Sequence, residues 1–299
     1  MSMRRVLPLA LGVVLLAGMA RGEDEAVTLK LRDPKPGETT WHERSAAADV
    51  VLKVTDASGG AVVDRREKAT ATTTFWQQIV ARSNTGVPTK LRRGYGSARV
   101  KDDLDFVKPL PFEGKQVNFQ RNNDGRYTFQ IAKGAELKDK DAQVLSSEFD
   151  KGIFGMERVM PDRPVKVGES WNIKFDMPTS IRQDNCAILF DPARAKSTAQ
   201  LTKVYKKDGV PYGQVVARWE VPVVSIHAVT TKFDLDKGST FICHCTADVP
   251  IDGSSPFGTF KKVAYIKCDD QVTVKGQKFG LSIIVRYDED ETVTAPPKR

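Results

Sequence analysis

The chain has 299 residues, of which 40% are hydrophobic and 28% are charged, with four cysteines, three histidines and a formal net charge of +8. A chain of this length can bury its own core in one large or two small domains, so it needs neither a disulfide nor a metal to fold. Lysine and arginine are interspersed with acidic residues and are not gathered with aromatics into a basic stripe, which argues against nucleic acid as a partner.

Residues 1–22 have the pattern of a secretory signal peptide: Arg4 and Arg5, an apolar run over residues 6–17, and small residues before an acidic stretch. The apolar run is shorter than the roughly 18 residues that a membrane-spanning helix needs, and no later segment comes closer. No cysteine precedes Cys186, so a lipoprotein anchor is not expected. We therefore expect a soluble periplasmic or secreted protein whose mature chain has no transmembrane segment.

Residues 23–136 are expected to form an N-terminal half rich in β-strands, because apolar and polar residues alternate with a period of two. A hairpin is predicted around the turn at residues 122–125, whose Asp-Gly pair tolerates positive φ. Its apolar positions are Val117, Phe119, Tyr127, Phe129 and Ile131.

Residues 137–160 are expected to be a helical connector. Within it, residues 139–149 place Val144, Leu145 and Phe149 on one side of a helix. A second short helix is predicted at residues 178–185. Helical patterns are otherwise scarce.

Residues 161–287 are expected to form a C-terminal β-rich half. Alternating strands are predicted over residues 215–223, 241–249, 260–274 and 281–287, with turns at residues 206–209 and 252–256. Residues 288–299, which begin with four consecutive acids, are predicted to be a flexible acidic tail. The fold class is therefore mainly β, with curved antiparallel sheets in two similar halves and one or two short helices.

A short internal repeat supports the idea of two similar halves. Residues 34–41 resemble residues 164–171, and the two initial prolines are 130 positions apart. In each copy, we expect a glycine to turn the chain and a tryptophan, Trp41 or Trp171, to enter a strand and cover one end of a core.

Four stretches carry a resemblance to a known class of proteins: residues 164–171, 191–195, 201–209 and 251–256. They resemble uncharacterised exported bacterial β-rich proteins, which are similar to the half-barrel class that includes the lipoprotein-localisation factors. The resemblance covers roughly residues 110–285. It implies a curved antiparallel sheet that wraps a helical lid over an apolar cavity, and it carries over no catalytic residue.

The cysteines allow more than one interpretation. Cys243 and Cys245 lie two positions apart on one predicted strand and cannot easily bond each other, whereas Cys268 on the next strand is within reach of either if the hairpin turns near residues 254–255. One disulfide from Cys268 is therefore predicted. The alternatives are buried thiols or a four-thiolate site that includes Cys186. A metal site that uses His244 is disfavoured, because that side chain points to the opposite face of the strand.

The sequence lacks the common catalytic motifs: there is no Gly-x-Ser-x-Gly elbow, no His-Glu-x-x-His pair, no phosphate-binding loop and no dinucleotide fingerprint. The acids Asp102, Asp103 and Asp105 are compatible with a two-carboxylate hydrolase, but a solvated loop fits them better. No catalytic residue, metal or cofactor is expected.

The preferred hypothesis is an apolar-ligand or lipid carrier. Its cavity would be lined by Phe119, Phe129, Trp219, Ile283 and Val285, provided that these side chains do not simply fill a dry core. The alternatives are a cell-envelope scaffold that acts through exposed strand edges and, least favoured, a hydrolase that uses a carboxylate pair.

Overall fold

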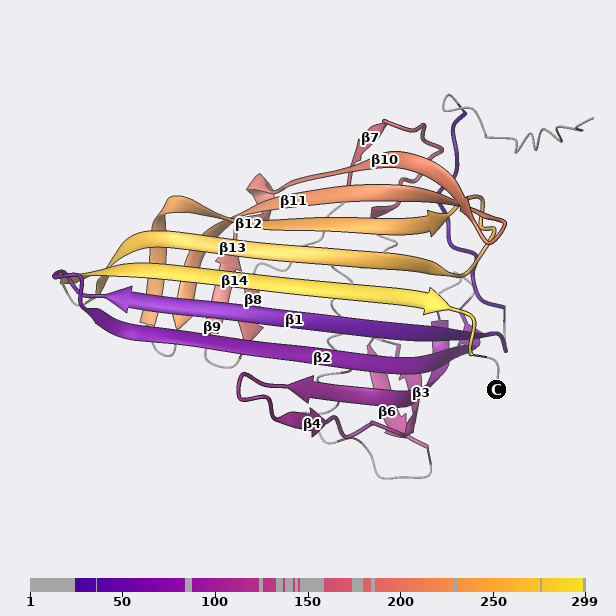
Figure 1. Ribbon diagram of the computed structural model, residues 1–299, viewed down its shortest axis with the longest axis horizontal. Coiled ribbons are helices and arrows are strands. Elements are labelled where there is room, and N and C mark those ends of the chain that lie inside the picture. Colours follow the sequence, from indigo (N-terminus) through magenta and orange to yellow (C-terminus); the bar gives the residue numbers. More distant parts are fainter. Residues whose placement is uncertain are drawn as a thin grey trace, which may run out of the picture.

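Long antiparallel strands dominate the computed structural model of the protein. It describes residues 25–35, 37–83, 88–123, 126–132, 137, 142, 145, 159–173, 180–183, 186–228, 231–274 and 276–297. Fourteen strands within these residues form one open sheet, in the order β6-β5-β3-β2-β1-β14-β13-β12-β11-β10-β7. Strand β4 pairs with β3, and the β8–β9 hairpin pairs with β11 through β9. The sheet is curved, with β8, β9 and β6 behind the long central strands (Figure 1).

The strand bounds are β1 Thr39–Thr55, β2 Ala61–Arg82, β3 Pro88–Lys101, β4 Val107–Pro109, β5 Gln116–Arg121, β6 Tyr127–Ile131, β7 Ser170–Asn172, β8 Ser180–Gln183, β9 Cys186–Phe190, β10 Lys196–Lys207, β11 Val210–Ala228, β12 Thr231–Pro250, β13 Gly258–Val274 and β14 Gln277–Thr294. A short 3-10 helix spans Pro192–Arg194.

The prediction of a mainly antiparallel β fold is confirmed, and the two β-rich stretches belong to one sheet. Strand β1, from the N-terminal stretch, pairs with β14, from the C-terminal stretch, from Trp41 opposite Thr294 to Thr55 opposite Gly280. The predicted hairpin at residues 117–131 is confirmed as β5–β6. The predicted turns also form, with positive φ at Asp208 and Gly209 and at Asp252 and Gly253.

Two predicted elements are wrong. The short helix expected at residues 178–185 is absent, because Ser180–Gln183 forms β8 and pairs with β9, which in turn lies against β11. Cross-strand pairing here outweighs a weak helical pattern. The tail expected from residue 288 is also wrong, since β14 continues to Thr294.

The acidic run of β14 is held by cations on both neighbouring strands. Glu291 lies opposite Arg44 of β1, and Glu289 lies opposite Lys262 of β13. Opposite charges across a ladder stabilise a sheet, so these acids belong to a strand despite their composition.

Other predictions fall outside the described residues. These are the signal peptide at residues 1–22 and most of the helix at residues 139–149. Of that helix only Ala142 and Leu145 are described, and both are helical.

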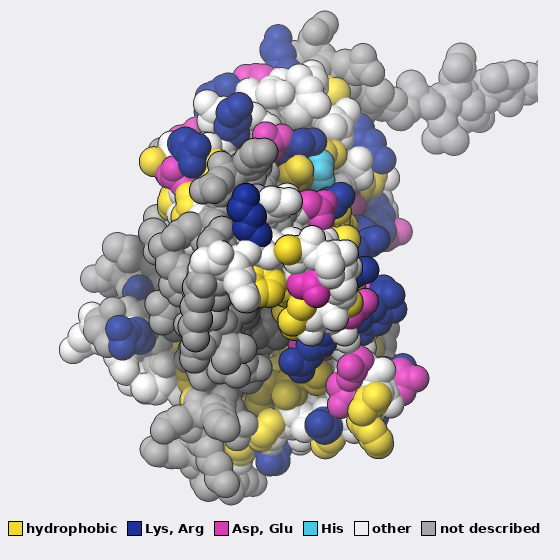
Figure 2. All heavy atoms as spheres, turned by 90° about the vertical axis from the view of Figure 1, so that its left-hand side faces the viewer, with side chains coloured by type: hydrophobic (Ala, Val, Ile, Leu, Met, Phe, Trp, Pro, Cys, Tyr) yellow, Lys and Arg dark blue, Asp and Glu magenta, His cyan; other side chains and the backbone are white. Residues whose placement is uncertain are grey.

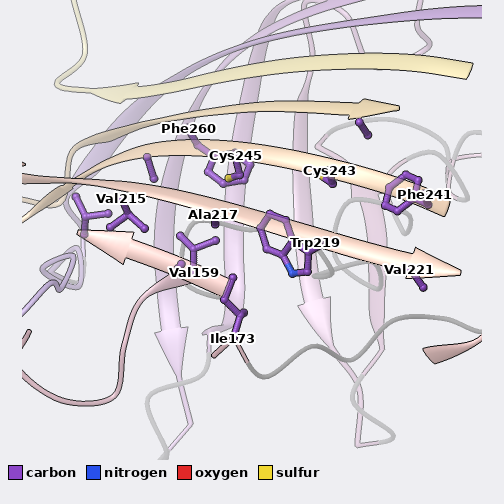
Figure 3. Close-up of a cluster of buried hydrophobic side chains, with 14 of the residues drawn as sticks. Val159, Ile173, Val215, Ala217, Trp219, Val221, Phe241, Cys243, Cys245 and Phe260 are labelled. Carbon is purple, nitrogen blue, oxygen red and sulfur yellow. The ribbon is translucent and has the colours of Figure 1, made fainter. Parts of the chain in front are cut away.

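One face of the sheet, called the inner face below, carries two separate clusters of buried apolar side chains. The smaller cluster joins β2, β3 and β5 with Phe112 and Leu145. The larger one spans β10 to β14 and is covered by side chains from residues 27–29 and 159–173. Figure 3 shows part of it, with Trp219 of β11 beside Val159 and Ile173.

The repeated turn is confirmed by its hydrogen bonds. Gly37 and Gly168 have φ of +83° and +84°, and both stand at the same place relative to the next strand. The Gly37 amide donates to Ile79 O at 3.5 Å and the Gly168 amide to Leu201 O at 2.7 Å. The carbonyl of each glycine accepts a side-chain amide at a matching position, Gln78 in one copy and Gln200 in the other.

The tryptophans of the repeat are not equivalent. Four positions separate Gly37 from Trp41, whereas three separate Gly168 from Trp171. Trp171 packs against the larger cluster and donates to Val159 O, as expected. Trp41 lies on the opposite face of β1 from the buried His42, and its indole N–H donates to Glu43. The expectation that Trp41 covers a core is wrong, because one extra residue reverses its side.

Candidate functional site

A partly exposed region of the inner face lies between the two apolar clusters. It consists of small and apolar side chains on β1, β2 and β14, called the floor below: Ala46, Ala48, Val50, Ala69, Ala71, Val285 and Tyr287. The alanines come together because the strands are in register: Ala46 lies opposite Ala71, and Ala48 lies opposite both Ala69 and Tyr287.

The floor is accessible, whereas the clusters on either side are sealed. Ala46, Ala48 and Val50 are half-buried, like Ala47 and Val51, which point to the opposite face of the same strand. Neither buried cluster includes these three inner-face side chains. Figure 2 views the molecule from the end that holds the β1–β2 and β13–β14 hairpins, where hydrophobic side chains lie among charged ones.

A polar network closes one end of the floor. His42 Nδ1 lies 3.2 Å from Glu291 Oε1, and His42 Nε2 lies 2.9 Å from Thr40 Oγ1. Arg44 Nη2 donates to Glu291 Oε2 at 3.1 Å. Alternation along β1 puts Thr40, His42 and Arg44 on the inner face, and the β1–β14 register brings Glu291 beside Arg44.

The network fixes the charges of its members. Burial raises the pKa of Glu291, but the charge of Arg44 and hydrogen bonds from His42 and Arg44 outweigh it and lower that pKa to about 2. Burial lowers the pKa of His42 more than its bond to Glu291 raises it. Glu291 is therefore a carboxylate at neutral pH, and His42 is neutral.

A wall of aromatic and guanidinium groups continues the network onto β2 and β3. The His42 ring stacks on Phe75 with a centroid distance of 4.6 Å and an interplanar angle of 8°. Arg93 lies over the same ring at 4.3 Å and donates to Gln77 Oε1 at 2.9 Å. A guanidinium over an aromatic face is favourable where water is excluded, and Arg93 is only 5% exposed.

On the other side, the network reaches β13. Buried Lys262 forms an ion pair with Glu289 and lies over the ring of Tyr287 at 5.0 Å. The Tyr287 hydroxyl donates to Glu289 Oε2 at 3.2 Å, and burial is the main cause that raises the pKa of Tyr287. The polar residues thus form a belt across five adjacent strands, β3, β2, β1, β14 and β13.

Thr40, His42 and Glu291 have the connectivity of a hydroxyl–imidazole–carboxylate relay. The hydroxyl is poorly placed for attack, because Thr40 is 2% exposed and its Oγ1 also lies 3.5 Å from Gln77 O. Arg44 in addition neutralises the carboxylate. The geometry supports a fixed, neutral imidazole in a structural network.

The five predicted ligand-cavity residues fall into two separate groups. Phe119 and Phe129 form an edge-to-face pair at 5.3 Å in the smaller cluster. Trp219 and Ile283 are buried in the larger cluster. Val285 packs against the larger cluster and, of the five, is the one that also lies on the floor. A ligand role for the other four stays a prediction.

The predicted disulfide is wrong: Cys243, Cys245 and Cys268 are buried thiols and form no disulfide in the part of the chain that is described. The β12–β13 register places Cys243 opposite Ala264 and Cys245 opposite Lys262. Cys268 therefore lies four positions further along the ladder than Ala264, about 13 Å by strand rise, which exceeds disulfide reach. Burial raises the pKa of Cys243 to about 12 and also raises that of Cys245, so both thiols stay protonated.

The acids at residues 102–105 stabilise the turn to which they belong. The Asp102 carboxylate accepts from the amides of Leu104 and Phe106 at 3.2 and 3.0 Å, and Asp105 pairs with Lys101 at 2.8 Å. This is a turn stabilised by its own side chains. Among the described residues, no group of three or more His, Cys, Asp or Glu side chains is arranged to hold a metal ion.

Comparisons with known proteins give a weak likeness in shape and none in sequence. No family model and no curated relative matches the chain. The solved structures that match include a lipovitellin described for its lipid–protein interactions (9% identity, TM-score 0.36), of which the chain spans about a quarter (89% of this chain, 26% of that one). They also include two structures from Pseudomonas putida: an outer membrane channel from strain F1 (8% identity, TM-score 0.20, 90% and 98% of the chains) and the toluene transporter TodX (8% identity, TM-score 0.22, 89% and 92%).

In the described part of the chain, no helix is both long enough and apolar enough to cross a bilayer.

Sequence reasoning missed the belt and the floor. A signal for the belt was present: Thr40, His42 and Arg44 alternate with a period of two, as do Glu289 and Glu291. The composition of these acids alone predicts a tail, because it takes no account of the strand that precedes them. The pairing of β1 with β14 joins positions almost 250 residues apart, which periodicity alone does not reveal.

Proposed function

We propose that the protein binds an apolar or amphipathic small molecule of lipid-like chemistry on the floor of the inner face. The observation that carries the proposal is the contrast in burial: the clusters on both sides are sealed, but the apolar floor between them is half-exposed. An accessible apolar surface with polar groups at one end is a common form of ligand site.

The composition of the floor suits a hydrocarbon chain. Alanines at Ala46, Ala48, Ala69 and Ala71 leave room that longer side chains would fill, and Val285 offers a further apolar contact. At one end, Arg44, Glu289 and Glu291 are between 18% and 25% exposed, so a polar head group could contact them. The predicted resemblance to lipoprotein-localisation factors implies the same kind of ligand, and it stays a prediction.

The experiment is a titration of the purified chain with a dansyl-labelled long-chain fatty acid, followed by fluorescence. Two variants are matched. Ala48→Trp places an indole on the floor, whereas Ala47→Trp places the same group on the opposite face of β1.

Displacing two methylenes of the probe costs about 1.6 kcal/mol, so we expect Ala48→Trp to raise Kd by about tenfold or more. Ala47→Trp is expected to bind like the wild type, and both variants should unfold at similar denaturant concentrations. Equal affinities for the two tryptophan variants, or no binding to the wild type, would overturn the proposal.

A further inference from the structure

One stretch of β2 has a strand on one side only. Strand β1 pairs with β2 along its length, but β3 begins to pair with β2 only at Thr70, opposite Lys101. Among the described residues, no strand pairs with the other side of residues 61–69, called the open edge below. Every residue from 61 to 70 is exposed. The open edge therefore presents unpaired backbone groups to solvent.

Open edges invite pairing with another chain, and proteins usually protect them with charged side chains, a proline or a bulge. The register of β2 against β1 is irregular next to Val54, opposite residues 61–63, and is regular from Val63 onward. The regular part, residues 63–69, has no proline and carries both signs of charge: Val-Asp-Arg-Arg-Glu-Lys-Ala. A row of like charges would repel a second copy of itself, whereas mixed charges can form opposite-charge pairs with it.

The order of the charges is complementary to itself. We propose that two copies of this chain associate by antiparallel pairing of their open edges, with Arg66 opposite Arg66 of the second copy. This register places Asp64 opposite Lys68 and Arg65 opposite Glu67, each twice because of the two-fold symmetry. The apolar ends of the stretch also meet, Val63 with Ala69. The partner is therefore a second copy of this chain.

The central arginine pair is compensated within each copy. Arg66 donates from Nε to Asp49 Oδ1 at 2.9 Å and from Nη2 to Asp49 Oδ2 at 2.5 Å. A bidentate carboxylate on the neighbouring strand balances each guanidinium, so the two arginines can face each other across the two-fold axis.

Other registers are worse. Shifting by one position in either direction places Arg65 opposite Arg66 or opposite Lys68, and it also turns each strand over relative to its partner. Shifting by two positions places Arg65 opposite itself, or Glu67 opposite itself. The pairing is limited to residues 63–69, because Val62 of one copy falls opposite Thr70 of the other, where β3 already pairs with β2.

The experiment is sedimentation velocity on the full chain over a concentration series up to about 0.5 mM, because a short strand-edge interface associates weakly. We expect a monomer–dimer equilibrium. Arg65→Glu places two glutamates opposite each other at two symmetry-related positions and should raise the dimer Kd at least tenfold. The double variant Arg65→Glu with Glu67→Arg restores both pairs and should return Kd to within about threefold of the wild type.

Arg92→Glu is the matched control, since it makes the same charge change at an exposed position where β3 is paired on both sides. It should leave Kd unchanged. A chain that stays monomeric throughout would overturn the proposal, as would a dimer that Arg65→Glu does not weaken. A dimer that the double variant fails to restore would exclude the proposed register.

Discussion

The two copies of the repeated turn lead into inner faces of opposite character. When the copies are aligned by their hydrogen bonds, Thr40 takes the place of Trp171, because Thr40 pairs with Gln77 as Trp171 pairs with Ala199. The next inward positions are His42 in the first copy and Ile173 in the second. The second copy builds a dry core where the first builds a polar network.

The contrast continues into the next strand. Gln77 lies opposite Arg93, whereas Ala199 lies opposite Ala217. The same backbone arrangement thus supports either apolar packing or hydrogen-bonded charges, provided that every buried charge has a partner. The floor lies beside the polar version, so an open apolar surface ends at a fixed set of charges.

The largest expected effect is a loss of stability when a side chain is removed from the larger apolar cluster. Trp219 is fully buried, so Trp219→Ala should lower the free energy of unfolding by about 3–5 kcal/mol, through lost burial and a new cavity. Urea denaturation measures this loss. Tyr265→Ala, on an exposed aromatic of β13, is the control and should cost less than about 1 kcal/mol. Similar losses for the two variants would contradict a sealed core around Trp219.

The polar side should respond to pH. Glu291→Gln should cost about 2 kcal/mol at pH 7, since it removes charge-assisted hydrogen bonds from His42 and Arg44. The folded-state pKa of Glu291, about 2, is below the unfolded value near 4.3. Its contribution is therefore complete above about pH 4.3 and is lost as pH falls towards 2.

Denaturation measured from pH 7 to pH 3 checks this expectation. The loss of stability with acid should be smaller in Glu291→Gln than in the wild type. Glu43→Gln, an exposed acid on the opposite face of β1, should leave the pH dependence unchanged. If Glu291→Gln retained the acid sensitivity of the wild type, the polar network would not be formed as described.

The repeated turn predicts a matched pair of smaller effects. An added Cβ at Gly37 or at Gly168 meets nothing within 4 Å, so alanine should cost only the backbone strain of positive φ, about 1–2 kcal/mol at each site. Thermal unfolding of Gly37→Ala and Gly168→Ala should give losses within about 0.5 kcal/mol of each other. Clearly unequal losses would show that the turns are not equivalent.

The prediction with the smallest expected effect on stability concerns the reactivity of the three buried thiols. In a Cys186→Ser background, Cys243, Cys245 and Cys268 should resist a maleimide reagent in the native state, because they are buried, and two have raised pKa values. All three should react in denaturant without a reductant. Failure to react in denaturant would indicate a disulfide instead, and mass spectrometry distinguishes the two results.

The strands could be predicted from the sequence where one face alternates strictly, as at Val215, Ala217 and Trp219. The hairpins could be predicted where Asp-Gly fixes the turn, as at Asp208 and Gly209. The pairing register between strands that are far apart in the sequence could not be predicted. The pairing of β1 with β14 creates the floor and the belt, and nothing local to either strand specifies it.

The disulfide prediction failed for a related reason. A displacement of a few positions in the β12–β13 register separates Cys268 from Cys243 and Cys245. The prediction of an acidic tail was wrong because Lys262 and Arg44, which are distant in sequence, neutralise Glu289 and Glu291. Composition contains no information on which residues pair across the sheet. Strands that carry many charges are therefore the elements that composition predicts least well.

The most direct test of ligand binding on the floor is photo-crosslinking with a fatty acid that carries a diazirine near its chain end, followed by peptide mass spectrometry. We expect labels on inner-face positions of β1 and β14, such as Ala48, Val50 and Val285, and their loss in Ala48→Trp. Labels confined to the opposite face, or an equal yield in Ala48→Trp, would contradict the claim that the floor between the two sealed clusters is the binding surface.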